Sequence, residues 1–298
     1  MFNIILVQTL FAAAFIIFKK TLPYGQPFFL VAIRMLLAGT LIFGYHLLFE
    51  KRVKITSQLL TLILTAAIFN IYVTNVFELW GLRFVTAAKA NFIYNLAPFL
   101  SAFFSYFMLG EKMTFKKWIG LIIGFVGFIP ILIAQSPEEL SVEHIGWLSA
   151  GELALICAAI GTSIGWVSVK KLGNSKISIA FTNGSTMLLG GIFALVNSLF
   201  VENWNPIPLS NYGYAIFYTI LGVFTLCIFA YNLYMLLLRK YSATFLSLTG
   251  LASPLITAFL GWIFLSESVN INFFISFAIV FVGLYIFYMQ EPHTHRSS

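Results

Sequence analysis

Long apolar runs separated by short polar segments follow one another along the whole chain. Each run is near the 17–25 residues with which an α-helix crosses about 30 Å of hydrocarbon. Ten runs can be marked, at about 2–18, 28–49, 57–79, 87–109, 116–134, 147–169, 178–200, 212–238, 243–265 and 271–290. The pattern predicts an all-α polytopic membrane protein with ten transmembrane helices, and it leaves no room for a catalytic or ligand-binding domain outside the bilayer.

Composition supports the assignment to a bilayer. Hydrophobic residues make up 60 % of the chain and charged residues only 9 %, with a mean hydropathy of +0.94, whereas soluble domains are about 25 % charged. The first run also resembles a signal-peptide core, with 12–14 as a small-residue site. Because no basic residue precedes it, and Lys19–Lys20 follow it as Lys170–Lys171 follow the sixth run, we assign it to the first transmembrane helix.

Basic residues predict the orientation. With a cytoplasmic N-terminus, twelve of the 17 Lys and Arg residues fall on inside loops or the tail, four fall outside, and Arg34 lies within a span. Cytoplasmic loops carry such an excess of basic residues. We therefore expect a multi-pass protein of the inner (plasma) membrane with both termini in the cytoplasm. Topology explains the net charge of +7, so we expect no nucleic-acid partner.

One sequence signature occurs twice, 156 residues apart. Pro98 stands thirteen residues before Glu111. Pro254 stands thirteen residues before Glu267. Proline and glutamate are rare in this apolar chain, so their recurrence in step indicates an internal repeat. Such repeats, especially inverted ones, are typical of secondary transporters.

The repeat predicts the domain organisation. An ungapped alignment of residues 88–128 with residues 244–284 has ten identities in 41 positions. Each half holds five predicted helices, an odd number, so the second half enters the membrane with the opposite orientation. The expected divisions are a first repeat at 1–135, an outside connecting loop at 136–146, a second repeat at 147–290 and a cytoplasmic tail at 291–298.

Two segments of the chain resemble the EamA repeat of the drug/metabolite transporter superfamily: residues 85–114, VTAAKANFIYNLAPFLSAFFSYFMLGEKMT, and residues 241–270, YSATFLSLTGLASPLITAFLGWIFLSESVN. The resemblance covers almost the whole chain and implies two five-helix repeats around a central cavity, with both termini cytoplasmic. Members export amino acids, nucleobases, drugs and other metabolites, and some import or exchange solutes. The second copy departs from the pattern at Ser276, which stands where the first copy has Gly120.

Polar residues of the fourth predicted helix recur every three or four positions and therefore share one face. They are Asn91, Tyr94, Asn95, Pro98, Ser101 and Ser105. We expect this face to line a cavity; the alternative is that the small and amide side chains hold helices together. Pro98 and Pro254 lie near the middle of their predicted helices, where each removes a hydrogen bond and kinks the helix, either as a moving hinge for gating or as a fixed bend.

If the resemblance holds, helices 1, 3, 6 and 8 supply the other walls of the cavity. The candidate substrate-binding residues there are Gln8, Tyr72, Asn75, Thr162, Trp166, Tyr231 and Tyr234. Aromatic and amide groups together suit a zwitterionic or heteroaromatic solute. The alternative for each aromatic residue is core packing or a place in the interfacial belt.

Few ionisable residues lie within the spans, and charge in hydrocarbon argues for function. Glu152 is a candidate for proton coupling or for contact with a cationic solute. Arg34, at comparable depth, would pair with Glu152 or with a substrate carboxylate; a purely structural Arg34–Glu152 pair is the alternative. Glu78 and Lys89 lie nearer the predicted outer boundary. Glu267, at a helix end, is expected to cap the next helix, as is Glu111.

No enzyme, cofactor or metal motif is visible: the chain has no aspartate, no nucleotide-binding glycine-lysine loop, and four histidines near membrane edges or in the tail. We expect a secondary transporter of small metabolites, amino acids or related polar or amphipathic solutes, working by alternating access. Export driven by protons or by exchange is favoured; import, and a structural or sensory subunit, are the alternatives. The expected partners are a small-molecule solute and the lipid bilayer, and a homodimer is compatible with the sequence.

Overall fold

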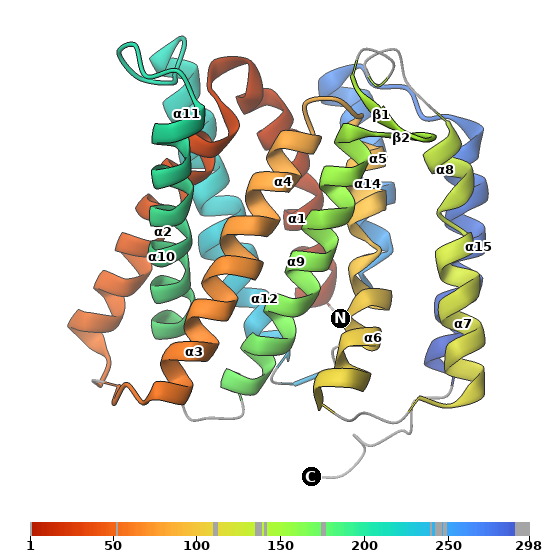
Figure 1. The fold of residues 1–298 in the computed structure, drawn as a ribbon, viewed down its shortest axis with the longest axis horizontal. Coiled ribbons are helices and arrows are strands. Elements are labelled where there is room, and N and C mark those ends of the chain that lie inside the picture. The colour runs from red at the N-terminus through yellow and green to blue at the C-terminus, as the bar shows by residue number, and fades with distance from the viewer. Residues whose placement is uncertain are drawn as a thin grey trace.

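The computed structural model describes residues 2–51, 53–109, 113–134, 139, 142–173, 177–238, 240–241, 246 and 249–289. Glu111, most of the connecting loop and the tail 291–298 lie outside these residues, and the side chain of Ser105 is not described. The described chain is a bundle of helices with one two-stranded hairpin (Figure 1). It is an all-α polytopic membrane protein.

The helices of the first half follow the predicted apolar runs. They are α1 (Phe2–Thr21), the short η1 (Leu22–Tyr24), α2 (Pro27–Phe49), α3 (Ser57–Ala66), the π-helix η2 (Ala67–Val73), α4 (Thr74–Gly81), α5 (Ala87–Tyr94), α6 (Ala97–Leu109), α7 (Phe115–Val126) and α8 (Ile129–Ile133).

The second half begins with the hairpin and continues with helices. Its elements are β1 (His144–Ile145), β2 (Leu148–Ser149), α9 (Ala150–Gly173), α10 (Ile179–Val201), α11 (Tyr212–Gly222), the π-helix η4 (Val223–Ala230), α12 (Tyr231–Leu238), α14 (Ala252–Leu265) and α15 (Ile271–Tyr288). Seven helical stretches of the described chain are long and apolar enough to cross a membrane, and α14 and α15 are shorter apolar helices.

The predicted span at 87–109 is divided. Helix α5 ends at Tyr94 and α6 begins at Ala97, so Pro98 lies in the first turn of a helix and not near its middle as expected. Pro254 likewise lies in the first turn of α14, which begins at Ala252. A proline has no N–H to donate and disfavours a helical conformation in the residue before it, so a helix start accommodates it better than a helix interior.

Two continuous helical stretches contain a π segment in their middle. The π segments start 156 residues apart (223 − 67), the same offset that separates the two prolines (254 − 98). Asparagine side chains bond to carbonyls around both segments: Asn75 Nδ2 donates to Ile71 O at 2.8 Å, and Asn232 Nδ2 donates to Ile228 O at 2.8 Å. Such bonds satisfy backbone groups that lack water inside a bilayer.

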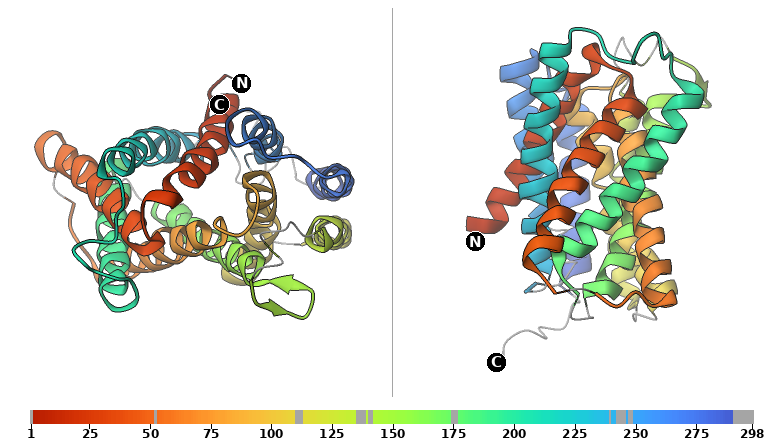
Figure 2. Two further views of the ribbon diagram at one scale, coloured as in Figure 1. Left: turned by 90° about the horizontal axis from the view of Figure 1, so that it is seen from above. Right: turned by 90° about the vertical axis from the view of Figure 1, so that its left-hand side faces the viewer.

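Helices of the first half pack mainly against helices of the second half. Helix α2 packs along α10, and α7 packs along α15, while α1 lies against α14 and α4 lies against α9. Figures 1 and 2 show the α7–α15 pair at one edge of the bundle and the α2–α10 pair at the opposite edge. The remaining helices form the centre, so residues far apart in sequence meet there.

Glycines bring the backbones of α7 and α15 into contact. A Cβ atom added at Gly120 would lie 2.6 Å from Gly283 O, and one added at Gly283 would lie 2.5 Å from Gly124 N. Small residues allow this close approach between membrane helices. Ser276, the departure from the repeat pattern, uses its Oγ to accept a hydrogen bond from Ile131 N at 2.9 Å.

The distribution of side chains is that of a membrane protein. Large apolar residues such as Phe115, Phe200 and Trp262 are exposed on the outside of the bundle. Polar and charged residues such as Arg34 and Glu152 are buried inside it. In lipid the apolar exterior needs no cover, whereas charged groups are stable only inside the bundle with partners.

Candidate functional site

A central cavity lies where α1, α4, α5, α6, α9, η4 and α12 meet. It contains about 1110 Å³ of atom-free space, part of which opens to the outside. Eight of the ten predicted substrate-binding residues line it: Gln8, Asn91, Tyr94, Asn95, Thr162, Trp166, Tyr231 and Tyr234. Pro98 also lines it. The structure thus brings together in one cavity predicted residues from three other spans and from the divided α5–α6 span.

The other two candidates, Tyr72 and Asn75, do not line this cavity, which corrects the expectation. The Tyr72 hydroxyl accepts a hydrogen bond from Asn197 Nδ2 of α10 at 2.6 Å. Asn75 Oδ1 accepts one from Arg34 Nη2 at 2.8 Å. Both residues lie within or directly after the π segment η2, where the ordinary spacing of about 3.6 residues per turn no longer predicts which way a side chain faces.

The Tyr94 hydroxyl begins a hydrogen-bonded chain across the cavity wall. It donates to Thr162 Oγ1 at 2.8 Å, and the Thr162 hydroxyl donates to Asn70 Oδ1 at 3.3 Å. The chain connects α5, α9 and η2, that is, both halves of the protein. Asn70 was not among the sequence candidates, although it lies on the same predicted span as Asn75.

Asn91 and Asn95 lie one turn apart on α5 and at its end. Asn91 Nδ2 donates to Ser253 Oγ at 2.8 Å and to Thr257 Oγ1 at 2.6 Å, both in α14. Asn95 Nδ2 donates to Asn91 O at 2.8 Å. The amide of Asn91 therefore holds two helices together as well as lining the cavity, and both interpretations of the polar face apply to it.

Aromatic rings surround one part of the cavity. The ring centroids of Trp166 and Tyr234 are 4.9 Å apart, and those of Phe11 and Tyr234 are 5.7 Å apart. Phe15 lies edge-on to Tyr94 at 6.0 Å. Sequence reasoning missed Phe11 and Phe15, although they stand three and seven residues after Gln8 and therefore share its helix face.

Glu78 is the only charged residue among the described residues that line the cavity. Its exposed fraction is 6 %. The sequence placed it nearer the outer boundary and gave it no role. A signal was available in the repeat, because the position 156 residues later is Tyr234, which lines the same cavity.

Arg34 and Glu152 do not pair with each other, so that expectation is wrong. The Arg34 guanidinium lies 3.8 Å from the centroid of the Phe18 ring and bonds to Asn75. Glu152 instead meets Lys89, whose Nζ is 2.7 Å from Glu152 Oε1. Neither Arg34 nor Glu152 lines the cavity. The packing of the helices brings Arg34 next to Phe18 and Asn75, and Glu152 next to Lys89.

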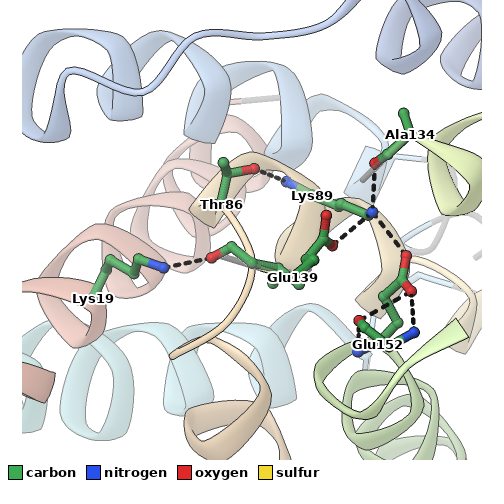
Figure 3. A network of polar contacts seen from close by, with 8 residues as sticks. Lys19, Thr86, Lys89, Ala134, Glu139 and Glu152 are labelled. Atoms are coloured by element: carbon green, nitrogen blue, oxygen red, sulfur yellow. Dashed lines mark hydrogen bonds and ion pairs between the residues drawn. The ribbon is translucent and has the colours of Figure 1, made fainter. Parts of the chain in front are cut away.

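Lys89 is the centre of a buried polar cluster (Figure 3). Its Nζ lies 2.7 Å from Glu139 Oε1 and 2.7 Å from Glu152 Oε1, and it donates to Ala134 O at 2.8 Å. Glu139 and Glu152 are each 0 % exposed, and Lys89 is 6 % exposed. One ammonium therefore contacts two buried carboxylates, and the cluster depends on all three side chains.

Glu152 also takes part in the N-terminal cap of α9. Its Oε2 accepts a hydrogen bond from Ser149 N at 2.7 Å, and Ser149 Oγ accepts one from Glu152 N at 3.2 Å. This reciprocal arrangement is a capping box, which the Ser-x-x-Glu spacing at 149–152 signals. This cap was not among the sequence predictions.

Further polar contacts join the elements at the same end of the bundle. Lys19 Nζ donates to Leu82 O at 2.7 Å and also to Val85 O, which ties α1 to the turn between α4 and α5. Glu267 Oε2 accepts from Ala87 N at 2.8 Å, at the start of α5. Glu267 was expected to cap the next helix, but Asn270 caps α15 and Glu267 reaches the first half instead.

The geometry agrees with the comparisons with known proteins. The chain matches the EamA-like transporter family over residues 1–133 and again over residues 149–289. It belongs to that family. A relative from Chlamydia muridarum, named an S-adenosylmethionine/S-adenosylhomocysteine transporter, is 34 % identical over 295 residues, which are 97 % of this chain and 92 % of the relative.

Two further similarities agree with membership of the EamA-like family. An uncharacterized transporter from Archaeoglobus fulgidus is 27 % identical over 282 residues, 94 % of this chain and 95 % of the relative. A crystal structure of a protein superposes with a TM-score of 0.62 and 17 % identity, covering 96 % of this chain and 93 % of the other, which shows a common fold.

This EamA-like protein is therefore a multi-pass membrane transporter of a small metabolite. The family and the relatives' names point to transport and not to an enzyme. Within the described residues, no group of three or more His, Cys or Glu side chains is placed to hold a metal ion. The cavity, with its amides, rings and single carboxylate, is the candidate solute site.

Proposed function

We propose that this protein exchanges S-adenosylmethionine for S-adenosylhomocysteine across the inner (plasma) membrane by alternating access. The observation that carries the proposal is the central cavity, whose wall combines a group of aromatic rings, several amides and one carboxylate. The relative from Chlamydia muridarum that aligns over almost the whole chain bears the name of a transporter of these two solutes.

The cavity suits the chemistry of these solutes. Each has an adenine ring, which stacks on aromatic side chains, and an amino-acid end that forms hydrogen bonds. Trp166 and Tyr234 offer ring faces, with centroids 4.9 Å apart. Gln8 and Asn95 are amides on the same cavity wall, suited to the polar end. A free amino acid as solute, which has no adenine ring, would leave most of these ring faces without a stacking partner.

Ten spans in two inverted halves, with both termini cytoplasmic, are part of the proposal. Support comes from the two successive family matches and from the common offset of 156 residues between prolines and between π segments. Equivalent contacts also recur: α1 packs against α14 and η4, as α9 packs against α6 and η2. A device of two such halves can open its central site to either side in turn.

The polar contacts around Lys89 and Glu267 close one end of the bundle in this proposal. They join α1, the α4–α5 turn, α5, α9 and the segment that follows α14. By the distribution of basic residues this is the outer end, so the structure corresponds to an inward-facing state. Solute then enters the cavity from the cytoplasmic side, and outward opening requires these contacts to separate.

Counterflow in proteoliposomes tests the function. Vesicles containing the full chain and loaded with unlabelled S-adenosylhomocysteine should accumulate labelled S-adenosylmethionine from outside, whereas vesicles loaded with buffer should not. A pH gradient imposed without internal solute separates exchange from proton coupling. Labelled amino acids and nucleosides in the same vesicles test the broader substrate class. Uptake of an amino acid but of neither adenosyl compound would refute the proposal.

A further inference from the structure

Glu78 stands out because it combines burial, charge and access to the cavity. It lies in α4, is 6 % exposed, and lines the cavity with the Tyr94 and Tyr231 side chains. Both tyrosines are close enough to interact with it electrostatically. In the described part of the chain, no basic nitrogen lies within ion-pair distance of its carboxylate.

Among the described residues, Arg34 is the cation that acts on Glu78, and it is held by other partners. Arg34 is close enough for an electrostatic attraction, but its guanidinium lies against the Phe18 ring at 3.8 Å and bonds to Asn75 at 2.8 Å. Arg34 does not line the cavity. Arg34 therefore offsets the charge of Glu78 only at a distance, and the carboxylate remains available to a solute in the cavity.

A buried carboxylate without an ion-pair partner is unfavourable, and a cation that enters the cavity relieves this cost. The tyrosine rings beside Glu78 add a second attraction, because aromatic faces attract cations electrostatically. A neutral solute of the same shape gains neither contribution. The arrangement therefore distinguishes solutes by charge more than by size.

We infer that Glu78 is the specificity-determining residue that recognises the cationic centre of the solute. The inference rests on the proposed function, which it deepens: Glu78 distinguishes the sulfonium of S-adenosylmethionine from the thioether of S-adenosylhomocysteine. These solutes differ by one methyl group and one positive charge. Exchange of the first for the second then moves one net positive charge across the membrane in each cycle.

The test compares the affinities of the two solutes in Glu78→Gln, which keeps the shape of the side chain and removes its charge. Affinity is measured in proteoliposomes as inhibition of labelled S-adenosylhomocysteine counterflow by each unlabelled solute. Removing the carboxylate charge that attracts the sulfonium weakens the binding of S-adenosylmethionine by about 10- to 100-fold, while the binding of S-adenosylhomocysteine changes little. Glu78→Asp keeps the charge and should retain the preference. Equal weakening of both solutes, or no change in either, overturns the inference.

Glu143→Gln is the matched control, because Glu143 is an exposed glutamate of the connecting segment. It should leave both affinities unchanged.

An imposed membrane potential, negative inside, should accelerate the inward movement of S-adenosylmethionine in wild type. Potential-independent exchange would contradict the charge movement.

A second pair of probes separates this inference from the proposed function. Choline and 3,3-dimethylbutan-1-ol have the same shape and differ in charge, and their binding is followed by the fluorescence of Trp166, identified by its loss in Trp166→Phe. If wild type transports neither adenosyl compound, the proposed function fails. A choline preference that disappears in Glu78→Gln still supports the role of Glu78, whereas an absent or equal response to the two probes refutes it.

Discussion

The buried cluster around Lys89 provides the sharpest prediction. Lys89→Met removes the ammonium that lies 2.7 Å from both Glu139 Oε1 and Glu152 Oε1, and it leaves two carboxylates of 0 % exposure without their cation. Breaking a buried ion pair by removing one partner costs about 3–5 kcal/mol. We expect the substitution to destabilise the outward-closed state more than the outward-open state, because opening hydrates both carboxylates.

The expected shift in population is large. Each 1.4 kcal/mol is a factor of ten, so a cost of about 3–5 kcal/mol favours outward opening by about two to four powers of ten. Ala14 lines the cavity and supplies a reporter position. In a variant with Cys157 and Cys227 replaced by serine, Ala14→Cys should react with a membrane-impermeant thiol reagent from outside much faster when Lys89→Met is present.

A matched variant distinguishes the effect of the Lys89 charge from the effect of the packing of its side chain. Adding Glu139→Gln and Glu152→Gln to Lys89→Met removes the uncompensated carboxylates, so the thermal stability lost in Lys89→Met should largely return. The reasoning would be refuted if Lys89→Met melted like wild type and Ala14→Cys reacted from outside no faster than before. Failure of the triple variant to recover stability would instead mean that Lys89 acts through its packing.

Three further substitutions have defined outcomes. Asn95→Leu should abolish counterflow while size-exclusion chromatography shows a folded protein, and unchanged transport would remove Asn95 from the solute site. Trp166→Ala should raise the KM for S-adenosylmethionine by about tenfold, because base stacking on a ring contributes about 1–3 kcal/mol; Trp166→Phe should retain most of the affinity. Ser149→Ala should lower stability by about 1 kcal/mol through loss of the cap of α9, and an unaltered melting temperature would contradict the capping box.

Helical spacing predicted much of the cavity. The polar face of residues 91–101 was readable because positions three and four apart share one face of a helix. Tyr72 and Asn75 were candidates by predicted depth and residue type, which do not say which way a side chain faces; both lie in or directly after the π segment η2, and neither lines the cavity. No feature of the local sequence announced that segment, although its counterpart η4 begins 156 residues later (223 − 67).

Charges were the least predictable part of the site. Arg34 and Glu152 were paired on predicted depth alone, whereas Glu152 meets Lys89 and Arg34 meets Phe18 and Asn75. The predicted depth in the membrane gives the position of a side chain along the membrane normal only. Whether two side chains pair also depends on their positions within the membrane plane. The capping box at 149–152 was local and therefore readable, but the reach of Glu267 to Ala87 depends on how α14 packs beside α5.

The sequence by itself determined the membrane class, the repeated signature and the helix faces that carry polar groups, because each of these follows from residues close together along one helix or from direct comparison of segments. Only the tertiary structure decided that Glu78 lines the cavity, that Arg34 does not, and that Lys89 bridges Glu139 and Glu152. These contacts join helices distant in sequence. Their energies depend on burial and distance, which are set by the packing of the whole bundle.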